Sequence, residues 1–175
     1  MENFLAFQSQ KTLCPATAVA HRFPISTPRP ARYAAGVSMK VFSHQHRVAY
    51  AECTLGNHVY YARYLDLLEI ARGEFFRHLG TSFLQWQERD VIFPVIEARL
   101  RYKSPARYDE VLTLEVWPAN AARVRLDFAY RIRHADGVLV LEAETFHVCT
   151  AQSEKPRRLP EELQDVIKPY LSPEA

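Results

Sequence analysis

The feature that most constrains the fold of this chain is a change in hydrophobic period, from about 3.6 residues to two. In residues 61–79, apolar side chains recur at three- and four-residue steps, which predicts one amphipathic helix of about five turns that Gly80 ends. The predicted stripe consists of Tyr61, Tyr64, Leu65, Leu68, Ala71, Arg72, Phe75 and Leu79. Four stretches with period two follow, at residues 96–103, 109–117, 123–133 and 138–150.

These four stretches have the pattern of half-buried strands. In the first, the apolar residues Ile96, Ala98, Leu100 and Tyr102 alternate with charged ones, which predicts one buried and one solvated face. In the third, the predicted inward residues are Val124, Leu126, Phe128, Tyr130 and Ile132. A turn at residues 135–137 leads directly into the last strand, so we expect an antiparallel meander.

Two further elements complete the prediction. Residues 41–51 are compatible with a strand ahead of the helix, and residues 160–171 with a short terminal helix. The economical way to bury the helix stripe is to wrap the sheet around it. The sequence therefore predicts an α+β fold with an antiparallel five-stranded sheet around one long central helix. Such a sheet has an open edge, which indicates pairing into an oligomer.

The 175 residues suffice for one domain. Residues 1–38 show no period and contain four prolines, at Pro15, Pro24, Pro28 and Pro30, which predicts a poorly ordered N-terminal extension ahead of a domain at 39–175. There is no apolar run of the ~18 residues that span a bilayer, and no signal-peptide pattern at the N-terminus. We expect no membrane partner.

Composition narrows the class of protein further. The 22 Lys and Arg against 20 Asp and Glu give a net charge of +2, unlike the single-sign field of a nucleic-acid binder. The three cysteines, Cys14, Cys53 and Cys149, are widely spaced, which argues against a disulfide framework or a structural zinc site. A cytoplasmic location fits these features best.

Three segments resemble the 4-hydroxybenzoyl-CoA thioesterase family of hotdog proteins: GNHVYYARYL at 56–65, EIARGE at 69–74 and YKSPARYDEVL at 102–112. The resemblance covers residues 41–171 and implies a hotdog fold that hydrolyses an acyl-CoA without metal or cofactor. It also implies a homodimer or homotetramer with active sites at the subunit boundary. The commonest branches of the family carry an aspartate where this sequence has Thr54, and a glycine where it has Asn57.

Thioester hydrolysis needs a group that activates water and donors that stabilise the oxyanion. The turn that opens the helix, at residues 58–61, offers free amide groups, and the resemblance implies that the Tyr61 amide polarises the carbonyl. Glu69, on the flank of the stripe, is the first choice of base. The alternative is that Glu69 only pairs with Arg72 at i+3.

Other residues near the turn compete for these roles. Glu52 supplies a displaced carboxylate or is a solvated strand end, and Thr54 positions water. His58 acts as base or donor, or else is structural; Asn57 orients the water, or else caps the helix. To two further residues, His147 and Cys53, we assign no role.

Substrate contacts are expected on two surfaces. Tyr60 and Tyr64, with Phe75 and Phe76, line an acyl tunnel or belong to the core. Basic side chains on and after the strand at 96–103 meet the CoA phosphates or form a charge-balanced face; these are Arg99, Arg101, Lys103 and Arg107.

Two other functions stay open. With Thr54 at the aspartate position, a non-hydrolytic hotdog protein that binds acyl-CoA or an acyl carrier is the main alternative. A hotdog dehydratase ranks last, because it needs a histidine paired with an acid and no acid is well placed beside His58.

Overall fold

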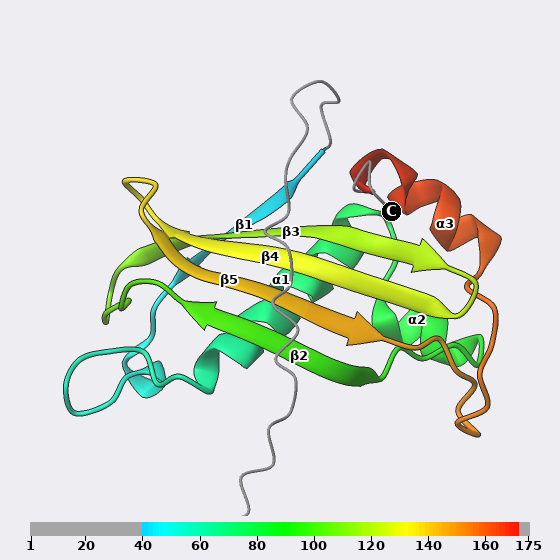
Figure 1. Ribbon diagram of the computed structural model, residues 1–175, viewed down its shortest axis with the longest axis horizontal. Coiled ribbons are helices and arrows are strands. Elements are labelled where there is room, and N and C mark those ends of the chain that lie inside the picture. Colours follow the sequence, from blue (N-terminus) through cyan, green and yellow to red (C-terminus); the bar gives the residue numbers. More distant parts are fainter. Residues whose placement is uncertain (1–39, 172–175) are drawn as a thin grey trace, which may run out of the picture. The chain divides into compact units, whose positions relative to one another are not determined.

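The fold is described by a computed structural model, which covers residues 40–171 (Figure 1). The predicted N-terminal extension lies outside these residues. The elements in chain order are β1 (Phe42–Arg47), a 3-10 turn (Tyr50–Glu52), α1 (Arg63–His78), α2 (Phe83–Glu88), β2 (Val95–Tyr102), β3 (Val111–Ala122), β4 (Arg125–His134), β5 (Leu139–His147), α3 (Glu161–Ile167) and a second 3-10 turn (Lys168–Tyr170).

All five strands form one antiparallel sheet in the order β1-β3-β4-β5-β2. The predicted α+β class and the meander of β3, β4 and β5 are confirmed. The predicted turn at 135–137 is also present: Gly137 has a φ of 86°, and Asp136 Oδ1 accepts the Val138 amide at 3.0 Å. The sheet therefore has two edges, β1 and β2.

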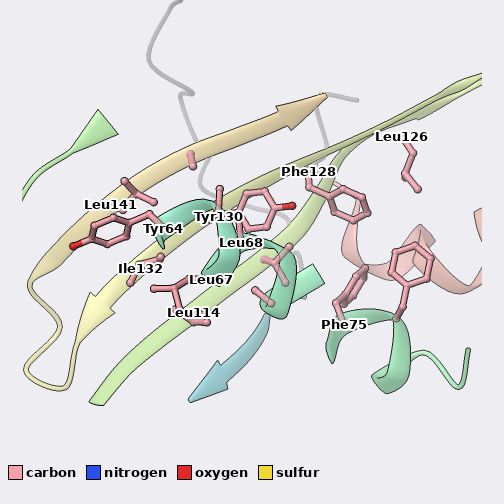
Figure 2. Packing of buried hydrophobic residues seen from close by; sticks show 14 of the residues in the cluster. Tyr64, Leu67, Leu68, Phe75, Leu114, Leu126, Phe128, Tyr130, Ile132 and Leu141 are labelled. Atoms are coloured by element: carbon pink, nitrogen blue, oxygen red, sulfur yellow. The ribbon is translucent and has the colours of Figure 1, made fainter. Parts of the chain in front are cut away.

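Helix α1 packs its apolar side chains against one face of the sheet, and the core lies between them (Figures 1 and 2). Leu67, Leu68 and Phe75 are buried among the inward side chains of β3, β4 and β5. The rings of Phe75 and Phe128 meet edge to face with centroids 6.2 Å apart. The predicted inward set of β4 is confirmed from Leu126 to Ile132.

The predicted helix stripe is partly wrong. Leu65 is 45% exposed and Tyr61 62% exposed, whereas Leu67 and Phe76 are fully buried. Tyr61 lies in the turn before α1 rather than in the helix. Phe76 is buried because the unpredicted helix α2 brings Phe83 against it, with ring centroids 4.4 Å apart. Because α2 packs beside α1, the buried face of α1 includes Phe76 and differs from the predicted stripe.

The prediction of a buried face on β2 is also wrong within this chain. Ile96 is 55% exposed and Tyr102 49% exposed, and only Leu100 is partly buried. The physical reason is position: β2 is an edge strand that pairs only with β5. Its apolar side chains lie open along that edge.

The remaining boundaries differ modestly from the predictions. The strand predicted at 41–51 ends at Arg47, and the strand predicted at 109–117 extends to Ala122 in a long hairpin with β4. The terminal helix predicted at 160–171 is α3 followed by a 3-10 turn. It is tied to α1, since Tyr170 packs against Phe75 with centroids 5.1 Å apart.

Candidate active site

The N-terminal end of α1 has free amide groups. Its cap residue, Ala62, offers no side-chain hydrogen bond, and the preceding turn is closed by the Arg63 amide on the Tyr60 carbonyl at 2.8 Å. Within residues 40–171, the amides of Tyr61 and Ala62 donate to no acceptor. The Tyr61 carbonyl accepts the Tyr102 hydroxyl at 3.0 Å. Two donors therefore remain free where the helix dipole favours negative charge.

The loop ahead of this turn is held by its own side chains. The Thr54 amide and hydroxyl both donate to the His58 carbonyl, at 2.8 and 3.3 Å. Asn57 has a φ of 54°, a left-handed conformation that asparagine tolerates, and its Oδ1 accepts the Tyr108 amide at 3.2 Å. The alternative that Asn57 caps the helix is therefore wrong.

His58 and Arg107 are brought together at this end of the molecule. The His58 Nε2 lies 3.4 Å from Arg107 Nη2, and the Val59 amide donates to the Ala106 carbonyl at 2.9 Å. A guanidinium only donates, so the His58 Nε2 is the acceptor. The structure thus joins a predicted catalytic residue to a predicted phosphate-binding one.

The other predicted basic residues lie on the sheet. Lys103 pairs with Glu142 at 3.0 Å, and Arg99 pairs with Glu97 at 2.7 Å. Arg101 is exposed and forms no ion pair among the described residues. The charge-balanced alternative therefore describes Arg99 and Lys103, while Arg107 and Arg101 stay available to a ligand.

Glu52 is engaged in its own loop. Both of its carboxylate oxygens lie 3.0 Å from His46 Nε2, and one of them accepts the Ala49 amide at 2.7 Å. Its side chain is largely buried. The alternative of a solvated strand end is wrong for Glu52, and its oxygens already have partners.

Glu69 has no such partners. It is exposed, and among the described residues it forms no ion pair or hydrogen bond. The alternative in which Glu69 pairs with Arg72 is wrong, because Arg72 Nη1 instead lies 2.9 Å from His147 Nε2. Glu69 lines two pockets, of about 510 and 320 Å³, that also share Phe83.

The residues predicted to line an acyl tunnel divide into two groups. Phe75, Phe76 and Tyr64 are buried in the core, so the core alternative holds for them. Tyr60 is half exposed and its ring lies 4.6 Å from that of Tyr61, beside the free amides. Only Tyr60 of this set remains near the open end of α1.

The sequence analysis missed a polar cluster beneath α1. Arg72 contacts His147, and beside them the Tyr130 hydroxyl lies 2.9 Å from Thr145 Oγ1. His147 is fully buried, and burial together with the Arg72 charge lowers its pKa to about 4. The available signal was an arginine inside an otherwise apolar stripe.

Within residues 40–171, no group of three His, Cys, Asp or Glu side chains lies close enough to bind a metal ion. No helix in this part of the chain is both long and apolar enough to cross a membrane.

Comparison with known proteins identifies the family. The model of the thioesterase-like superfamily matches residues 39–167. The acyl-CoA thioester hydrolase YbgC of Escherichia coli is 34% identical over 118 residues, covering 67% of this chain and 88% of YbgC. The crystal structure of TT1821 from Thermus thermophilus matches with a TM-score of 0.68 and 32% identity, over 72% of this chain and 96% of that one.

A more distant structure agrees in fold. Slr0204 from Synechocystis, a 1,4-dihydroxy-2-naphthoyl-CoA thioesterase, is 23% identical with a TM-score of 0.69 and covers 74% of this chain and 96% of its own. These matches confirm the resemblance that the three sequence segments indicated. The chain, with its five-stranded antiparallel sheet packed on α1, belongs to the thioesterase-like superfamily of hotdog proteins.

Proposed function

We propose that this protein hydrolyses an acyl-CoA thioester to the free acid and CoA. The observation that carries the proposal is the pair of free amides, Tyr61 and Ala62, at the N-terminal end of α1. The identity to YbgC, which is named for this activity, supports it.

The free amides supply the oxyanion site. When water attacks the thioester, negative charge moves onto the carbonyl oxygen, and preorganised N–H donors stabilise that charge more than they stabilise the substrate. The Tyr61 amide is the first donor and the Ala62 amide the second. The α1 dipole adds to their effect.

Glu69 supplies the base in this proposal. Its carboxylate is unpaired within the described chain, so it is free to take a proton from water as the oxygen attacks the carbonyl carbon. The tetrahedral intermediate then expels the CoA sulfur as a thiolate, a good leaving group because thiols ionise near pH 8.5. Thr54 occupies the position of the family aspartate, and in this proposal it stabilises the loop conformation and takes no part in catalysis.

The spacing along α1 supports a site shared between two chains. Glu69 lies six residues after Arg63, the first residue of α1, which is roughly 9 Å along the axis at 1.5 Å per residue, and Tyr61 lies in the turn before the helix. A base must lie within about 3 Å of the water that it activates, so this separation favours placing the two groups of one site on different chains. We infer that Glu69 acts on a thioester held by the Tyr61 amide of a second copy.

The open edge at β2 supports this homodimer. Its exposed apolar side chains and unpaired backbone groups suit antiparallel pairing with a second β2. Two such dimers form the homotetramer that we also propose. Free thiols at Cys53 and Cys149 agree with a cytoplasmic location.

Arg107 is the proposed contact for the CoA phosphates. Its guanidinium lies 3.4 Å from His58 Nε2, in the loop that leads into α1. A guanidinium binds phosphate oxygens through paired N–H donors. His58 then acts as a hydrogen-bonding neighbour of Arg107, and Tyr60 covers the thioester.

The test is thiol release from a panel of acyl-CoA substrates by the full chain. Wild type should release CoA, and Glu69→Gln should lower kcat by at least ~100-fold, the scale expected for loss of a general base. Glu88→Gln is the matched control, because Glu88 is an exposed helical carboxylate away from the pockets. Near-normal turnover in Glu69→Gln would remove Glu69 from the mechanism.

The main alternative is a protein that binds acyl-CoA without hydrolysing it, suggested by Thr54 in place of an aspartate. Tight binding of acyl-CoA across the panel, with no thiol released from any member, would support that alternative over the hydrolase.

A further inference from the structure

The polar cluster beneath α1 contains a cation that has no counter-charge among residues 40–171. Arg72 Nη1 donates to His147 Nε2 at 2.9 Å, and the Arg72 guanidinium lies 5.4 Å from the centre of the Phe83 ring. Arg72 Nε is buried and has no acceptor among the described residues. A guanidinium in this setting keeps its charge, since its pKa lies far above neutrality.

The groups that face Arg72 do not neutralise it. His147 is neutral at physiological pH, and Tyr130 and Thr145 offer hydroxyl groups that bond to each other. Asp127 accepts the His147 amide at 3.2 Å, and it is bound by Arg125 at 3.1 Å and by Asn120 at 3.0 Å. No carboxylate of residues 40–171 lies within ion-pair distance of Arg72.

A partly buried charge of this kind is costly unless something pairs with it. Arg72 borders a pocket of about 320 Å³ that Glu69 also lines. The other walls are mainly apolar, with Phe83 from α2 and Val91, Ile92 and Phe93 from the segment before β2. The pocket is thus lined mainly by apolar side chains and by the cationic Arg72. This composition is typical of a site for a small amphipathic ligand.

We propose that this pocket receives the acyl group of the substrate and that Arg72 binds an anionic oxygen on that group. The inference rests on the proposed function, because Glu69 places the pocket beside the thioester. It assigns the substrate class as CoA thioesters of short acids that carry a second carboxylate, which is ionised at neutral pH.

The position of Arg72 sets the length of the acyl group. Arg72 lies about one helical turn beyond Glu69, roughly 5 Å along α1. With the thioester carbon beside Glu69, an acidic group about two or three carbons away reaches the guanidinium. Longer unbranched chains without a polar end would leave Arg72 unpaired and would bury it further, at a cost in binding.

The experiment compares matched pairs of substrates that differ only in the acidic group. The pairs are succinyl-CoA with butyryl-CoA and glutaryl-CoA with pentanoyl-CoA. We expect wild type to favour the acidic member of at least one pair by tenfold or more in kcat/KM. The two pairs place the carboxylate at two different distances from the thioester.

Variants assign the preference to Arg72. Arg72→Met should bring the ratio of kcat/KM within each pair close to one, and Arg72→Lys should retain part of the preference because it keeps the charge. Arg89→Met is the matched control, since Arg89 also stacks on an aromatic ring, that of Trp86, and is exposed outside the pocket. It should keep the wild-type ratio.

Two results would overturn the inference: ratios near one in wild type for both pairs, or an unchanged ratio in a folded Arg72→Met variant. Calorimetric binding of the same pairs to wild type gives the same comparison without turnover. If no substrate is hydrolysed but the acidic members bind at least tenfold more tightly, the hydrolase proposal fails and the assignment of the pocket stands. If thiol is released without preference, only the pocket assignment fails.

Discussion

His147 lies fully buried against Arg72. Its burial and the neighbouring guanidinium charge both favour the neutral imidazole. Burial withdraws the charged form from water, and the adjacent guanidinium repels it, so the pKa falls from 6.5 to about 4. The Nε2 lone pair is then free to accept from Arg72 at neutral pH. Protonation of His147 would place two cations in contact beneath α1.

This lowered pKa predicts a pH-dependent stability. Between about pH 4 and 6.5 the unfolded chain binds a proton at His147 that the folded chain excludes, so the free energy of unfolding rises with pH over that window. Stability is not reduced by this group above pH 6.5, and the loss reaches roughly 2 to 3 kcal/mol by pH 4. Urea unfolding of wild type and of His147→Gln at pH 7 and 4.5 should show a smaller loss in the variant; parallel losses would contradict the prediction.

At the scale of elements, α1 is fixed by contacts on two sides. Its sheet-facing side buries Leu67 and Leu68 (Figure 2), and its other side meets α2 through Phe76. Leu65, in contrast, faces away from this core. Two leucines of one helix thus have opposite environments.

This contrast predicts unequal effects of the same substitution. Leu67→Ala should lower the free energy of unfolding by about 2 to 5 kcal/mol, because it leaves a cavity in the core. Leu65→Ala should change it by at most about 0.5 kcal/mol within a single chain. Denaturant titration of both variants at a concentration that dissociates oligomers is the measurement, and a large loss from Leu65→Ala would contradict the burial pattern.

The elements show how far the sequence alone reaches. Period-two alternation is a local property, so β4 and the turn at 135–137 were predicted well. Burial of β2 and the offset of the α1 stripe depend on which elements become neighbours, and periodicity carries no information about α2 or about an open sheet edge. For the same reason the fixed partners of Glu52 and the contact of Arg72 with His147 were not foreseen.

At the scale of the whole molecule, the proposed active site is divided between two chains. The free Tyr61 amide lies in the turn before α1, and Glu69 lies six residues after the first residue of the helix, Arg63. In the proposed dimer, antiparallel pairing across β2 would bring the amide of one copy to the carboxylate of the other and create two equal sites.

Mixing two inactive variants tests this division. Tyr61→Pro removes the amide donor and Glu69→Gln removes the base, so each variant alone should be nearly inactive. After subunit exchange, half of the dimers are mixed and each carries one intact site, which should restore about a quarter of wild-type turnover. No recovery after verified exchange would place both groups in a single chain.

If the exposed apolar edge of β2 forms the proposed dimer contact, catalysis becomes a function of protein concentration. A site completed by a neighbour exists only while the neighbour is bound, and mass action governs that fraction. Turnover per chain should therefore decline on dilution through the dissociation constant of the dimer. The Ile96→Lys variant should have a higher dissociation constant for the dimer, because it places like charges against each other where the two β2 edges meet.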